Sequence, residues 1–76
     1  MNKERRKSLR EIQSKLDRLG QDLETLKEEE EEYRDNMPEN LQESERYQRA
    51  AEVCDLLLEA LENMDSAYQQ IVEAVE

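Results

Sequence analysis

The chain has 76 residues with one cysteine, no histidine and a net charge of −10, and 42% of its residues are charged. A chain of this size forms one domain and buries only about 60 to 65% of the surface that its unfolded form exposes. A lone cysteine excludes an internal disulfide framework, and no apolar run is long enough for a signal peptide or a membrane span. We therefore expect a soluble, cytoplasmic, single-domain protein over residues 1–76, without membrane contact.

The charge is unevenly distributed along the chain. Residues 1–18 contain seven Lys or Arg side chains and three acids, a net charge of +4, so the remainder carries −14. A basic N-terminus and an acidic C-terminus each oppose the helix dipole, and side-by-side placement of the two ends relieves that cost. Because such a polar composition also permits disorder, a fold is predicted only if the apolar residues show a pattern.

Apolar residues in the first half recur at alternating spacings of three and four. From Leu9 to Met37 they occupy the a and d positions of a heptad, with Glu30 at an a position where an apolar residue is due. The pattern predicts one long helix over residues 3–35.

The sole proline marks the connection, which we expect over residues 36–43. Pro38 cannot continue a helix, and it disfavours helical conformation at Met37. We expect a short helical turn over residues 38–42. Three residues are candidate N-caps for the restart: Asn36, Asn40 and Ser44.

A second heptad runs from Tyr47 to Val75 and predicts a helix over residues 44–75. In an antiparallel pair the a positions of one helix meet the d positions of the other, and here every facing pair of residue numbers sums to 80, from Leu9 with Ile71 to Tyr33 with Tyr47. The sequence thus predicts an all-α fold, an antiparallel coiled-coil hairpin. Its expected seam is Leu9, Ile12, Leu16, Leu19, Leu23, Leu26, Tyr33, Tyr47, Cys54, Leu57, Leu61, Met64, Tyr68 and Ile71.

The second helix has more apolar surface than one neighbouring helix can cover. The additional residues form a candidate dimer face: Val53, Leu58, Ala60, Ala67 and Val72. We expect two hairpins to pair through their second helices as a homodimeric four-helix bundle. The alternative is that the alanines only favour helix formation on a monomer surface.

The acidic run from Glu28 to Glu32 points all round its helix and is typical of a solvated surface. Glu30 differs, since its a position points toward Ala50; it is either a partly buried defect or a determinant of register or partner. The ExxE and ExxD spacings also resemble the magnesium sites of all-α nucleotide pyrophosphatases, but the seam places Glu59, Glu62 and Asp65 toward solvent rather than inward. A candidate acidic partner surface remains: Glu28, Glu29, Glu31 and Glu32.

The sequence shows no recognisable motif for catalysis or cofactor binding. The sequence has no histidine and only one glycine, so it offers neither the commonest general base nor a glycine-rich phosphate loop. Cys54 is predicted to be a buried, inert thiol at an a position. We predict no enzyme activity, no cofactor and no metal. Direct nucleic-acid binding is not expected, because the acidic chain repels phosphate.

The stretch EEYRDNMPENLQESERY and the helix after it resemble a group of short, uncharacterised acidic helical proteins of phages and integrative elements of Gram-positive bacteria. Such proteins share an acidic helix, a DNMPENLQ-like turn followed by SERY, and an alanine-rich second helix. The resemblance covers residues 28–76. It implies a helical hairpin and a mobile-element setting, and it carries over no functional residues.

The sequence is compatible with three functions. The first is a non-enzymatic hairpin that self-associates and acts by protein contact with an unidentified partner, as an accessory protein of a phage or mobile element. The second is an acidic inhibitor that imitates nucleic acid and occupies a basic site on a host defence or DNA-binding protein. The third is an enzyme, which requires metal binding at the ExxE pairs.

Overall fold

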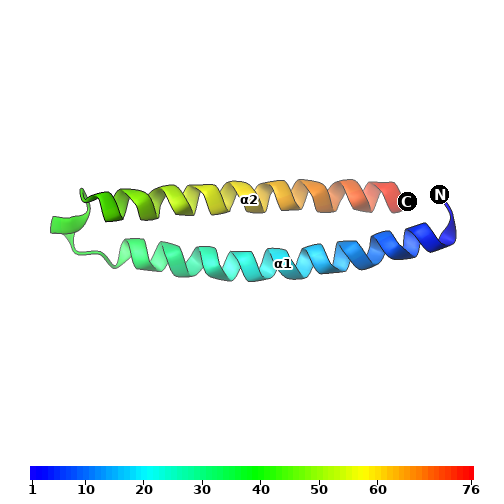
Figure 1. The fold of residues 1–76 in the computed structure, drawn as a ribbon, viewed down its shortest axis with the longest axis horizontal. Helices are drawn as coiled ribbons and strands as arrows, with labels where there is room; N and C mark the ends of the chain where they lie inside the picture. The colour runs from blue at the N-terminus through cyan, green and yellow to red at the C-terminus, as the bar shows by residue number, and fades with distance from the viewer.

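The computed structural model describes all 76 residues and contains two long helices. Helix α1 spans Lys3–Asp35, a 3₁₀ helix η1 spans Glu39–Leu41, and helix α2 spans Glu45–Val75. The two long helices lie side by side along a rod of 59 × 15 × 13 Å, with the turn at one end and both termini at the other (Figure 1). The predicted all-helical class, with two long helices packed against each other, is confirmed.

Side-chain caps and the proline account for where the helices begin and end. The Asn2 side chain accepts a hydrogen bond of 2.8 Å from the Arg5 backbone N–H and caps α1. Helix α1 ends at Asp35, three residues before Pro38, with Asn36 as its C-cap. Of the three candidate N-caps, Ser44 caps α2 by accepting from the Tyr47 N–H at 3.2 Å.

The interior of the helix pair is very small. Only Met37, Ala50 and Cys54 are buried, and no large side chain is completely enclosed. The chain exposes 6138 Å², whereas a compact folded monomer of 9.1 kDa exposes about 4900 Å². The difference of about 1200 Å² reflects the elongated shape of the rod and its small interior.

The orientation of α1 about its own axis differs from the predicted seam. Four seam residues at d positions face outward instead of toward α2: Ile12 is 49% exposed, Leu19 57%, Leu26 56% and Tyr33 46%. The a-position residues Leu9, Leu16 and Leu23 remain half-buried, and the e-position residues Gln13, Gly20, Lys27 and Arg34 are half-buried beside them. The expectation that α1 presents its a and d rows to α2 is therefore wrong at the d row.

Of the polar e-row side chains, Gln13 bonds to α2 and Lys27 pairs within α1. The Gln13 side chain donates a hydrogen bond of 3.1 Å to the Tyr68 hydroxyl. The Lys27 side chain is only 13% exposed, and its ammonium lies 2.6 Å from Glu31. Such long side chains cover apolar surface with their stems while their charged ends stay paired. About half of the surface of each apolar d-row side chain stays exposed in the single chain.

Gly20 lies in the interior of α1, and its replacement by alanine is expected to stabilise the protein. Glycine inside a helix is about 0.8 to 1.0 kcal/mol less favourable than alanine, and an added Cβ at this position meets no atom within 4 Å. We expect the free energy of unfolding to rise by about 1 kcal/mol in urea titrations followed by circular dichroism. An unchanged or lower value would show that another group fills the space beside Gly20 in solution.

Candidate interaction surface

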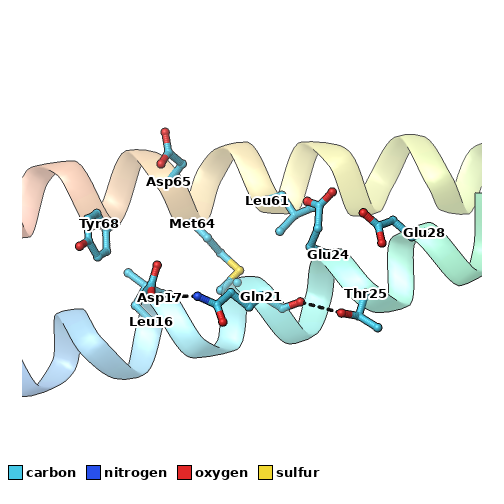
Figure 2. Close-up of a pocket in the computed structure, with 11 residues that line it drawn as sticks. Leu16, Asp17, Gln21, Glu24, Thr25, Glu28, Leu61, Met64, Asp65 and Tyr68 are labelled. Carbon is cyan, nitrogen blue, oxygen red and sulfur yellow. Dashed lines mark hydrogen bonds between the residues drawn. The ribbon is translucent and has the colours of Figure 1, made fainter.

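The two long sides of the helix pair have different chemistry. One side holds a groove of about 600 Å³ between the helices (Figure 2). Its rims carry polar side chains such as Asp17, Gln21 and Glu24 of α1 and Asp65 of α2, and Leu16, Leu61 and Met64 also line it. The groove residues are also bonded to each other, since the Gln21 amide donates to Asp17 at 3.1 Å. We call this side the polar face.

The exposed d row of α1 lies on the opposite side. Residues two apart in a helix point about 160° away from each other, because each residue turns the helix by about 100°. Leu19 is two residues from both Asp17 and Gln21, so it points away from the groove. The other members of its row follow at intervals of seven and lie along the same line.

A second row of apolar residues on α2 lies on this same side. Ala67 is two residues after Asp65, so it too points away from the groove. Ala60 and Val53 precede it at intervals of seven, and the 55% exposed Leu56 lies one turn before Ala60. We define the apolar face as these two rows: Ile12, Leu19, Leu26 and Tyr33 of α1 with Val53, Ala60 and Ala67 of α2.

The predicted dimer face is therefore divided between the two sides. Val53, Ala60 and Ala67 lie on the apolar face, whereas Leu58 and Val72 share the heptad position of Asp65 on the polar face. Leu58 is 48% exposed. The contribution of α1 to the apolar face was missed from the sequence, because a d-position residue is apolar whether it packs within the chain or against another chain.

The other seam residues lie between the helices. Cys54 is 5% exposed and Ala50 is 2% exposed. The Met64 side chain extends from α2 toward α1 (Figure 2). The remaining α2 seam residues are half-buried: Tyr47, Leu57, Leu61, Met64, Tyr68 and Ile71.

The acidic run of α1 does not form a converging site. Glu28, Glu29 and Glu32 are exposed, while Glu31 is half-buried and paired with Lys27. The hydrogen bond with Glu31 is the main reason that the pKa of Lys27 is raised. Glu30 is half-buried. No three acidic, cysteine or histidine side chains come close enough together to hold a metal ion.

Burial makes Cys54 a slow nucleophile. Loss of solvation raises the pKa of its thiol above the ordinary value of 9.0, so the folded protein keeps the proton where the unfolded chain loses it. We expect alkylation by iodoacetamide at pH 8 to be at least about 10-fold slower in the native protein than in urea, because the thiolate is the reacting form. Equal rates would show that Cys54 is accessible.

The raised thiol pKa also predicts a loss of stability in alkaline solution. The pKa of the thiol is higher in the folded state than in the unfolded state. The contribution of the protonated thiol to the free energy of unfolding is therefore fully present below the unfolded pKa, and it declines as the pH rises through and beyond 9.0. Urea titrations from pH 7 to 10 give the free energy of unfolding of the native protein and of Cys54→Ala. The change with pH in the difference between these two free energies is the decline that the thiol causes. Parallel curves for the two proteins would contradict it.

The fold and its surfaces define a small two-helix protein with an apolar face whose α1 row is about half exposed and whose α2 row is half-buried. No protein-family model matches the chain, and no curated protein and no solved structure matches it. Neither helix has a stretch long and apolar enough to cross a membrane.

Proposed function

We propose that the protein is a non-enzymatic antiparallel coiled-coil hairpin that pairs with a second copy through the apolar face, forms a four-helix bundle and acts by protein contact. The observation that carries this proposal is the outward row of four large apolar side chains on α1. Each is about half exposed in the single chain, although burial of such a side chain contributes about 1.5 to 3 kcal/mol.

The small interior supports the same proposal. Three buried residues give a two-helix chain little stability of its own, and chains of this size commonly gain a larger core by oligomerisation. In a dimer the apolar face of each copy covers that of the other. The half-buried leucines at the a positions of α1 then become part of a four-helix interior.

The resemblance of residues 28–76 to mobile-element proteins adds a setting to the proposal. We place the protein in the cytoplasm as an accessory protein of a phage or integrative element. In the dimer the polar face and the acidic residues Glu28, Glu31 and Glu32 stay outside, so they are the surfaces left for an unidentified protein partner.

The proposal is tested by the concentration dependence of thermal unfolding. A dimer that unfolds to monomers has a Tm that rises with protein concentration, whereas the Tm of a monomer does not. We expect circular dichroism melts to shift upward between 2 and 200 μM chain on the order of several degrees. A Tm independent of concentration over this range would contradict self-association.

An acidic inhibitor that imitates nucleic acid is a second candidate, favoured by the exposure of Glu28, Glu29 and Glu32 on a rigid helix. It predicts binding to a basic protein that weakens steeply as salt is raised. Changing all three residues to glutamine should weaken that binding. The matched control is to change Glu59, Glu62 and Glu73 on the other helix to glutamine, and an equal loss in both variants would contradict a specific acidic site.

A further inference from the structure

The charge of the helix pair is concentrated at its turn end. Residues 21–59, which form the half with the turn, hold 14 acidic and four basic side chains, a net charge of −10. Residues 1–20 and 60–76, which form the half with both termini, hold seven of each and are neutral. The rod is therefore strongly acidic at one end and balanced at the other.

Two symmetric arrangements can cover the apolar face with a second copy. A two-fold axis along the rod places both turns at the same end, with α1 over α2 of the second copy. An axis across the rod places the turns at opposite ends, with each helix antiparallel to its own copy. Both arrangements are four-helix bundles, so apolar packing alone does not choose between them.

Electrostatics distinguishes the two arrangements. With the turns together, one end of the dimer collects a net charge of −20, twice that of one turn half. Neighbouring helices lie about 8 to 10 Å apart, close to the Debye length of about 8 Å at physiological salt. Those charges consequently repel each other. With the turns apart, each acidic half lies beside a neutral half.

We infer that two copies pair with their turns at opposite ends, so that the basic N-terminal part of each α1 lies along the acidic part of the other. This inference rests on the proposed self-association and names its geometry. The outward row of α1 is then symmetric about its own centre, since Ile12 meets Tyr33 of the second copy and Leu19 meets Leu26 of the second copy.

The same register defines a charge pair at the edge of the interface. Lys15 and Glu29 are exposed, and each lies one helical turn from the apolar row, on the side away from α2. In the antiparallel α1 pair, Lys15 lies beside Glu29 of the second copy. The two Asp22 side chains meet near the axis, so Asp22→Asn is expected to tighten the dimer.

A charge exchange tests this pair in solution. Within one chain Lys15 and Glu29 are about 21 Å apart along α1, so they interact only between copies. We expect Lys15→Glu alone to weaken the dimer about 3- to 10-fold, and the double variant Lys15→Glu with Glu29→Lys to recover most of that loss. Additive effects in the double variant would contradict the register.

The orientation itself is measured with spin labels on a protein that lacks the native thiol. Cys54→Ser is first shown to keep the mass and helicity of the native protein, and one label is then attached at the exposed Asn40→Cys in the turn. With the turns apart, the two labels lie on opposite sides of the two-fold axis. At about 1.5 Å of rise per residue on each side, the label-to-label distance is about 45 Å or more.

Each outcome of this measurement has a separate meaning. A distance of about 45 Å or more in a dimer supports the inference. A distance below about 25 Å, as expected for helices packed about 10 Å apart with their turns together, overturns the inference and leaves the proposed dimer intact. A monomeric mass with no dipolar coupling overturns the proposed self-association as well.

Discussion

Replacement of Leu19 by glutamate is expected to abolish the proposed dimer. Leu19 is 57% exposed in the single chain and lies at the centre of the apolar face. Each dimer loses two buried leucines, which costs at least about 3 kcal/mol, and two carboxylates must be desolvated as well. The dimer dissociation constant should rise by on the order of 100-fold or more, as measured by sedimentation equilibrium.

The matched control for this variant is Leu58→Glu. Leu58 is 48% exposed, similar to Leu19, but it lies on α2 at the polar face. The same chemical change there should leave the dissociation constant within about threefold of the native value, as expected for a surface change. If Leu58→Glu breaks the dimer and Leu19→Glu does not, the interface lies on the opposite side of the helix pair.

The second large effect is expected at Ala50, the most buried residue of the chain. Ala50 is 2% exposed, so a larger side chain at this position is expected to displace the residues around it. We expect Ala50→Leu to lower the free energy of unfolding by about 1 to 3 kcal/mol, the usual cost of overpacking. For a domain of this size, each 1 kcal/mol corresponds to about 4 to 8 °C in Tm.

Ala74→Leu provides the comparison for that variant, since Ala74 is exposed on the same helix. Both variants make the same chemical change, but Ala74 is exposed one residue before the end of α2, so the difference between their Tm values reports chiefly the burial of Ala50. Circular dichroism melts at one protein concentration give both values. Equal Tm values would show that the space around Ala50 is not closed.

The two long helices were predictable from the sequence because local physics determines them. The heptads extend over most of each helix, Pro38 interrupts the first, and the Ser44 hydroxyl supplies the cap of the second. Each of these signals depends on neighbouring residues in the chain. The packing of the two helices on each other also followed, since each has an apolar stripe to cover.

The rotation of α1 could not be predicted in the same way. The heptad identifies apolar a and d rows, but it does not say whether both rows face the same partner. The choice depends on interactions between residues far apart in sequence, such as the hydrogen bond from Gln13 to Tyr68. The apolar face of α1 follows from those interactions and becomes visible only when the helices are placed together.

The apolar face is proposed to be covered by a second copy of the chain. Multi-angle light scattering on a size-exclusion column at physiological salt measures this most directly, since the mass that it gives does not depend on the elongated shape. We predict a mass twice the 9.1 kDa of one chain. A mass of one chain at concentrations up to about 100 μM, which corresponds to binding weaker than about −5.5 kcal/mol, would contradict the claim.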